Sequence, residues 1–134
     1  CLGGFEAIGA LCARVPGVRT LEAGSTVGYG SGFVTRRPTR IAVVGAGYAH
    51  GFGLERSAAP GGRGGAVASA LRRLRGRREP LCARAGQRKL PVLGRVGMCD
   101  TVLDATGTQV QPGEVVELPV NPIFVNASVP RVYL

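Results

Sequence analysis

Short apolar runs, interrupted by glycine and proline, make up most of this chain. Residues 5–20 alternate loosely between apolar and polar positions, and Pro16-Gly17 precedes a second short run from Val18 to Leu21. Residues 39–44 form a β-branched, apolar run that is short enough to be a buried strand. These spacings predict short strands separated by turns.

The second half of the chain continues this pattern. Residues 81–96 predict two strands that flank a hairpin turn at Ala85-Gly86-Gln87. Further short strands are predicted at residues 101–105, 115–118 and 123–125. Because proline cannot donate to a sheet ladder, we expect Pro119 and Pro122 to place their neighbours at sheet edges. Residues 28–32 are too rich in glycine for a regular element.

One stretch has helical rather than strand periodicity. Residues 57–65 hold Pro60 and four glycines, which predicts a loop. Residues 66–75 then place apolar side chains at helical spacing, with arginines on the other face. The sum is a mainly β fold: a compact, barrel-like domain of antiparallel strands with one basic helix.

Composition narrows the class of protein. A chain of 134 residues forms one domain with a real core, and 45% hydrophobic against 19% charged residues argues against disorder. No apolar run could span a bilayer, so we expect a cytoplasmic protein without a membrane partner. The four cysteines lack metal-site spacing and His50 is far from them in sequence, so no metal site is expected. Because the first residue is Cys1, we also expect the chain to begin inside a longer gene product.

The net charge of +9 comes almost wholly from one segment. Residues 71–95 carry nine basic residues against Glu79 alone, and the remaining chain is nearly balanced. A basic amphipathic helix can bind acidic membranes or nucleic acid. Its apolar stripe is narrow, however, and a helix that docks on the domain with solvated arginines is the simpler interpretation. We therefore do not expect nucleic acid as a partner.

The most informative segment is residues 45–51 (GAGYAHG), directly after the run at residues 39–44. Its glycines suggest a dinucleotide-binding turn, which requires a third small residue, a following helix and an acidic residue about 20 positions later. Here His50 occupies the third small position, Gly51-Phe52-Gly53 starts a helix poorly, and residues 64–72 contain no acid. We reject the dinucleotide interpretation on these grounds.

Four segments in order resemble the C-terminal β-domain of alanine racemases, enzymes that depend on pyridoxal phosphate. Residues 21–30 (LEAGSTVGYG) resemble P-A-G-E-x-V-x-Y-G, and residues 38–42 (PTRIA) with 47–51 (GYAHG) resemble P-T-R-I-A…G-Y-A-D-G. Residues 89–98 (KLPVLGRVGM) with 101–106 (TVLDAT) resemble P-V-V-G-R-V-C-M-D-x-T-M-V-D-V-T. Residues 110–116 (VQPGEVV) and 129–133 (VPRVY) complete the match, which covers most of residues 15–133.

The resemblance implies a function and a set of site residues. In that family a TIM barrel precedes the β-domain and holds pyridoxal 5′-phosphate on a lysine, and the partner subunit's β-domain supplies a tyrosine base. By this resemblance Tyr48 is the catalytic base, a backbone N–H at Met98 meets the carboxylate of the amino-acid substrate, and Arg95 lies near the substrate entrance. The implied partners are the TIM-barrel domain and a second subunit in a homodimer, and the implied reaction interconverts L- and D-alanine.

This chain departs from the family pattern at several places. The only lysine, Lys89, lies in the hairpin segment, so no residue here is expected to bind the cofactor and the chain alone should be inactive. His50 stands where Asp is usual, and Ala127 stands where a tyrosine often contacts the cofactor phosphate. Residues 60–79, with their helix, are expected to be an insertion. The alternative interpretation is a degenerate, non-catalytic remnant or an interaction module on the same β fold.

Overall fold

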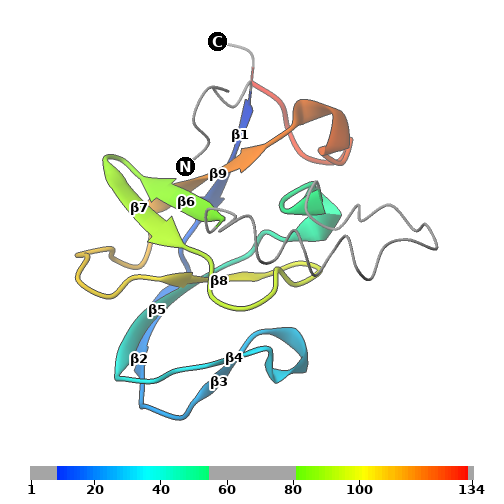
Figure 1. Cartoon of the computed structure of the whole chain (residues 1–134). Coiled ribbons are helices and arrows are strands. Elements are labelled where there is room, and N and C mark those ends of the chain that lie inside the picture. The colour runs from blue at the N-terminus through cyan, green and yellow to red at the C-terminus, as the bar shows by residue number, and fades with distance from the viewer. Residues whose placement is uncertain (1–8, 55–80, 133–134) are drawn as a thin grey trace, which may run out of the picture.

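The computed structural model describes residues 9–54 and 81–132 of the chain (Figure 1). Within these ranges the strands form three antiparallel sheets. The largest sheet has four strands in the order β1 (Gly9–Arg14), β9 (Val115–Val120), β6 (Cys82–Ala85) and β7 (Arg88–Pro91). The second sheet has three strands in the order β2 (Gly17–Leu21), β5 (Thr39–Val44) and β8 (Thr101–Asp104).

The smallest sheet pairs two short strands at the bottom of Figure 1, β3 (Thr26–Val27) and β4 (Phe33–Val34). The 3-10 turn η1 (Tyr29–Ser31) connects them, as the glycine-rich sequence there predicts for an irregular segment. An isolated bridge between Val92 and Leu103 links the end of β7 to β8. In the described part the sheets otherwise stay separate, so the fold is mainly antiparallel β, but the expected barrel is not closed.

The central strand β5 explains the continuous apolar run at residues 39–44. It pairs with β2 on one side and with β8 on the other, and side chains on both of its faces are buried. Ala42 and Val44 belong to the main core, whereas Ile41 belongs to a smaller cluster with Val27 and Leu93. A strand with a core on each face needs apolar residues at successive positions, as the sequence predicts.

The main core lies between the four-stranded and the three-stranded sheets. β9 contributes alternate buried side chains at Val116, Leu118 and Val120, because successive residues of a strand point to opposite faces. Leu103 of β8 and Phe52, which follows β5, are fully buried in the same cluster. This packing fixes the end of β5, from which the chain leaves the sheet.

Most of the sequence-based strand predictions are confirmed. The hairpin of β6 and β7 turns at Gly86, whose φ of +59° suits glycine. β8 and β5 begin at the predicted residues, and β5 also ends at its predicted residue. The predicted loop at residues 57–65, the basic helix at residues 66–75 and the insertion at residues 60–79 lie outside the described residues.

Two predictions about the C-terminal strands are wrong. Residues 122–124 form the 3-10 turn η3 (Pro122–Phe124), not a strand, because the Asn121 side chain accepts a hydrogen bond from Ile123 N and Pro122 starts the turn. Pro119 does not mark an edge strand, since β9 lies between β1 and β6. β6 pairs with β9 only opposite Glu117, so Pro119 lies beyond that pairing.

Candidate functional site

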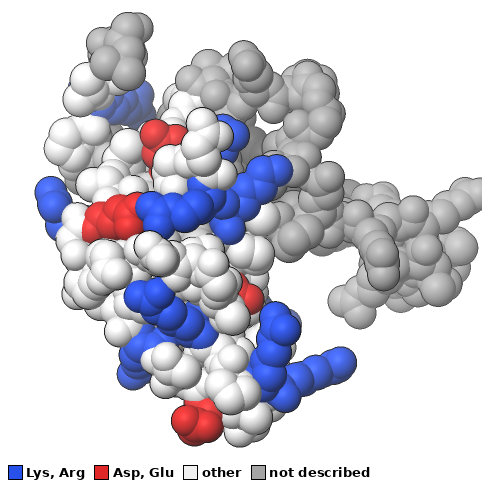
Figure 2. Space-filling view, turned by 90° about the vertical axis from the view of Figure 1, so that its left-hand side faces the viewer, with Lys and Arg blue, Asp and Glu red and all other residues white. Residues whose placement is uncertain are grey.

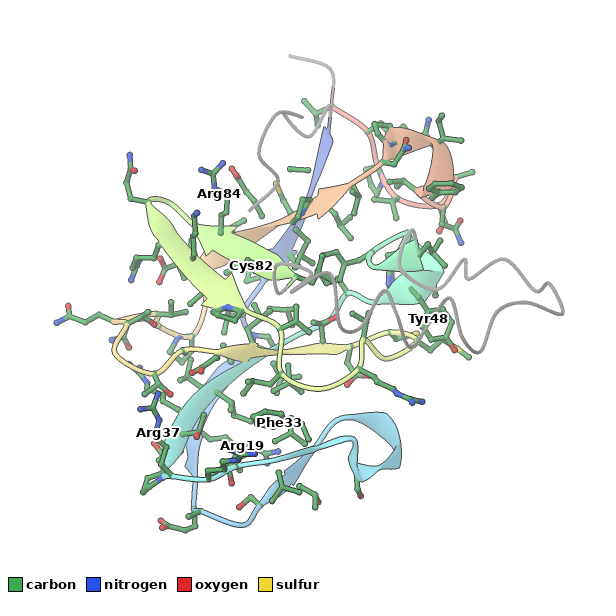
Figure 3. The ribbon with its side chains drawn as sticks, viewed as in Figure 1. Arg19, Phe33, Arg37, Tyr48, Cys82 and Arg84 are labelled. Carbon is green, nitrogen blue, oxygen red and sulfur yellow. The ribbon has the colours of Figure 1, made fainter. Side chains whose placement is uncertain are left out.

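Tyr48 lies on a short turn directly after the central strand β5. The chain leaves β5 at Val44 and enters the 3-10 turn η2 (Tyr48–His50) after Gly47. The Tyr48 side chain is 41% exposed, although the turn beneath it is fixed by hydrogen bonds. Figure 3 shows Tyr48 on the side of the domain opposite the β6–β7 hairpin, which carries Arg84.

A second loop, residues 97–100, holds this turn in place. It is itself a tight turn, in which Gly97 N donates to the Asp100 carbonyl at 2.9 Å. The backbone N–H groups of Tyr48 and Ala49 donate to the carbonyls of Gly97 and Met98, each at 3.0 Å. We refer to residues 45–51 and 97–100 together as the glycine-loop pair.

The glycines of this pair permit close approach of the two backbones. A Cβ placed on Gly47 would lie 2.1 Å from the Gly97 carbonyl oxygen and 2.7 Å from that of Met98. A Cβ on Gly51 would lie 2.6 Å from the Phe124 carbonyl oxygen, and its φ of +95° is left-handed. The glycines that suggest a dinucleotide turn in the sequence therefore serve loop packing, and β5 has antiparallel neighbours rather than a βαβ setting.

Further contacts on the core side hold the glycine-loop pair in place. The Thr101 hydroxyl, at the start of β8, donates to the Ala46 carbonyl at 2.6 Å, and this bond is buried. Phe52 is fully buried directly after the turn. The His50 side chain closes the turn, because its Nδ1 accepts a hydrogen bond from Gly47 N at 3.2 Å. The position of Tyr48 is thus set by backbone and buried contacts, while its own side chain stays accessible.

The structure brings two of the three predicted site residues together. Met98 is 58% exposed and lies next to Tyr48, since its carbonyl accepts from Ala49 N. Among the described residues, the Met98 N–H donates no hydrogen bond. This N–H and the half-exposed Tyr48 therefore lie on two loops whose backbones are hydrogen-bonded to each other.

Arg95 is placed differently. Its side chain is exposed, and its backbone lies against the loop at Gly28, where a Cβ would come within 3.3 Å of Arg95 N. In the described ranges its guanidinium makes no hydrogen bond or ion pair, with Tyr48 or with any other residue. In the sequence it lies two residues before Gly97, outside the glycine-loop pair.

The residues that depart from the family pattern lie at different places. Ala127 is exposed in the segment after η3, and Lys89 is exposed on β7. Neither residue belongs to the glycine-loop pair. The part of the chain that the structure describes contains no group of three or more side chains able to hold a metal ion.

Two supporting residues escaped the sequence analysis. Thr101 binds Ala46 as described above, and Arg40 on β5 donates from Nη1 to the Thr108 carbonyl at 2.6 Å and from Nη2 to that of Val110 at 2.8 Å. An arginine inside an otherwise apolar strand is a signal of such a role, because a half-buried guanidinium needs acceptors. The roles belong to the scaffold rather than to the chemistry.

The charged face of the domain is remote from Tyr48. Figure 2 shows lysine and arginine side chains with interspersed acidic ones on the side of the domain that lies to the left in Figure 1. Arg88 and Glu114, which link β7 to the turn before β9, form an ion pair. Within residues 9–54 and 81–132, no helix is long and apolar enough to cross a membrane.

Fold and site together define a small antiparallel β domain that presents the exposed Tyr48 from a hydrogen-bonded turn. The chain belongs to the alanine racemase C-terminal domain family, because the profile of the family described as "Alanine racemase, C-terminal domain" matches residues 8–123. This result confirms the family that the four sequence segments indicate.

Individual relatives agree with this assignment. An alanine racemase of Brucella ovis is 38% identical over 96 residues, which are 72% of this chain and 19% of the relative. One from Acidiphilium cryptum is 34% identical over 110 residues, or 81% of this chain and 25% of the relative. One from Polaromonas naphthalenivorans is 57% identical over 42 residues, which are 31% of this chain and 12% of the relative. The chain thus spans a quarter or less of these relatives' length.

Solved structures show the same fold. The biosynthetic alanine racemase of Pseudomonas aeruginosa superimposes with a TM-score of 0.66 at 26% identity, covering 93% of this chain and 34% of that one. The alanine racemase of Bartonella henselae, with covalently bound pyridoxal phosphate, gives a TM-score of 0.58 at 28% identity, covering 81% of this chain and 25% of that one. The β domain described above is therefore one part of the architecture of those enzymes.

Proposed function

We propose that this chain is the C-terminal domain of an enzyme that interconverts L- and D-alanine, and that Tyr48 is one of its two bases. Racemisation requires removal of the Cα proton from one face and its return on the other, so it needs a base on each face. The observation that carries the proposal is an exposed tyrosine on a turn held by backbone hydrogen bonds to a second loop. A fixed position is what proton transfer demands.

Tyr48 would exchange a proton with Cα through its hydroxyl oxygen. The Met98 N–H, on the adjoining loop, would donate to the substrate carboxylate and so orient the substrate beside Tyr48. Arg95, exposed and without a described partner, would attract the anionic carboxylate at the entrance. In this proposal the loop of residues 45–51 supplies the proton-transfer group, and the loop of residues 97–100 orients the substrate.

The described residues do not fit a complete cofactor site. The only lysine of the chain is Lys89, which is exposed on the hairpin side of the domain, and Ala127 offers no hydroxyl to a phosphate. We therefore assign pyridoxal 5′-phosphate to a TIM-barrel domain outside these 134 residues. In the proposed cytoplasmic enzyme, that barrel comes from the partner subunit of a head-to-tail homodimer, and Tyr48 reaches across the interface.

The decisive test is Tyr48→Phe in the full-length protein that contains this chain. We expect kcat to fall by about 10²- to 10⁴-fold in both directions, with an unchanged melting temperature, because only the hydroxyl is lost. Met98→Leu is the matched control: it keeps the backbone N–H and should keep near-wild-type kcat. Near-wild-type racemisation by Tyr48→Phe would remove Tyr48 from the mechanism.

The non-catalytic alternative is favoured by the His50 and Ala127 departures. The chain alone, mixed with pyridoxal phosphate, is expected to be inactive under either hypothesis. The intact mass of the native gene product and its activity together separate them. A TIM barrel adds about 250 residues, so a racemase subunit would have a mass of roughly 40 kDa, whereas a product of 13.8 kDa would be a stand-alone β domain. A product of the larger mass that binds the cofactor but does not racemise alanine would establish the degenerate form.

A further inference from the structure

His50 has a contact that neither the resemblance nor the proposed mechanism explains. Its Nδ1 atom accepts a hydrogen bond from Gly47 N at 3.2 Å, so the side chain spans the turn that carries Tyr48. Three backbone bonds close the same turn: His50 N and Phe52 N donate to the Gly47 carbonyl at 3.0 and 3.2 Å, and Gly51 N donates to the Tyr48 carbonyl at 3.0 Å. The side-chain bond is the one that a substitution can remove.

The contact fixes the chemical state of the imidazole. A neutral histidine has one donor and one acceptor nitrogen, whereas a protonated histidine has two donors. With Nδ1 as the acceptor from Gly47 N, this geometry assigns the ring proton to Nε2. Tautomer and ring orientation follow from this one bond.

The bond also accounts for the departure from the family pattern at this position. An aspartate three residues after Gly47 could accept the same N–H through its carboxylate, as an acidic side chain does in the first turn of a helix. His50 Nδ1 performs that task without a negative charge. The substitution of Asp by His therefore preserves the turn and removes a charge two residues from Tyr48.

The surroundings of His50 are consistent with Nδ1 as the hydrogen-bonded atom of its imidazole. His50 is half-buried and lines a shallow cavity of about 410 Å³ with Cys12, Arg14 and Ser128. Arg14 is the charged side chain on this cavity, and its guanidinium donates to the Gly113 carbonyl at 3.0 Å. In the described part of the chain, the imidazole makes its hydrogen bond with Gly47 N.

We propose that His50 is the positioning residue of Tyr48: its neutral imidazole accepts the Gly47 N–H through Nδ1 and holds the η2 turn in the conformation that presents the tyrosine hydroxyl. The catalytic part of this proposal rests on the proposed function of Tyr48. The structural part, which concerns the tautomer and the turn, stands independently of it.

The test exploits the geometry of amide side chains. The Oδ1 atom of asparagine reproduces the place of histidine Nδ1, whereas the amide of glutamine reproduces that of Nε2. In the full-length protein we expect His50→Asn to keep kcat within about twofold of wild type, whereas His50→Gln and His50→Leu lower it on the order of 10- to 100-fold with little change in KM. Equal kcat in all variants, or activity kept by Gln and lost by Asn, would overturn the proposal.

A spectroscopic measurement separates this proposal from the role of Tyr48. In the ¹⁵N-labelled full-length protein near neutral pH, the imidazole signal absent from His50→Asn should show a proton on Nε2 and an unprotonated Nδ1. The Gly47 amide signal should move in His50→Leu but not in Tyr48→Phe. A proton on Nδ1 would refute the positioning role. If the tautomer is as expected but Tyr48→Phe stays active, the turn is held by His50 and the mechanism alone is wrong.

Discussion

The strands around β5 and the glycine-loop pair are stabilised in opposite ways. In the strands, buried side chains such as Ile41 and Leu103 fill the space between sheets, and the backbones stay a sheet spacing apart. In the loops, the backbones themselves are in contact, and Gly47 leaves no room for a Cβ against Gly97. The sheet thus tolerates exchange among apolar residues of similar volume, whereas the loops depend on the absence of a side chain.

This difference suits the proposed chemistry. Because the two loops are joined through their backbones, the Tyr48 side chain is not used to hold them together. Thr101 connects the two regions, because it belongs to β8 and its hydroxyl binds the Ala46 carbonyl. Substitutions in each region, and in the connection, should separate stability from activity.

The largest effect on stability is expected in the core. Leu103→Ala removes a fully buried side chain of the main cluster, so it should lower the free energy of unfolding by about 2–5 kcal/mol. The folded fraction should keep its specific activity, because no site residue moves. Val115→Ala, on the exposed face of β9, is the control and should change stability by less than about 1 kcal/mol. Denaturant unfolding followed by circular dichroism measures both, and equal values would contradict the core assignment.

Gly47→Ala should do the opposite of Leu103→Ala, because it should affect activity more than stability. The new methyl group meets two backbone carbonyls, so the loops must separate at a cost of about 1–3 kcal/mol. Activity of the full-length protein should fall far more than the folded fraction, since Tyr48 moves with the loop. Gly45→Ala provides a matched control, because a Cβ there meets nothing within 4 Å. Equal activities of the two variants would show that close approach does not position Tyr48.

The smallest of the three effects is expected at the connection. Thr101→Val keeps the volume but removes the buried hydroxyl, which should lower stability by about 1 kcal/mol. Hydrogen exchange should accelerate at the amides of Tyr48 and Ala49 and not in β9, because the loop pair loses its support. The exposed Thr20→Val on β2 serves as the control. Uniform acceleration across the domain would mean that loops and strands open together.

Local pattern predicted the strands well where one physical rule dominates. The run at residues 39–44 is apolar at successive positions because β5 faces two cores, and the β6–β7 hairpin follows from its turn residues. Residues 123–125 misled the prediction, because their apolar character suggests a strand while Asn121 and Pro122 impose a turn. Pro119 shows that pairing can stop short of a proline inside an interior strand.

The site was predictable only in part. Tyr48 and Met98 came from the resemblance, and nothing in their spacing of 50 residues indicates that their loops are hydrogen-bonded. The contribution of Thr101 depends on a register between β5 and β8 that a single sequence does not reveal. In the sequence His50 is only a departure from the family motif, whereas in the structure its Nδ1 accepts a hydrogen bond from Gly47 N.

Gly53 lies close to Val96 and Leu81, and this closeness bears on the cost of connecting the two described parts of the chain. A Cβ on Gly53 would lie 3.1 Å from Val96 Cγ2 and 3.7 Å from Leu81 Cδ2, so the chain positions on either side of residues 55–80 lie close together. The entropy of closing a loop grows only with the logarithm of its length, about 0.6 kcal/mol for each doubling. The spatial closeness of the two described ends thus makes the entropic cost of connecting them depend only weakly on the number of residues between them.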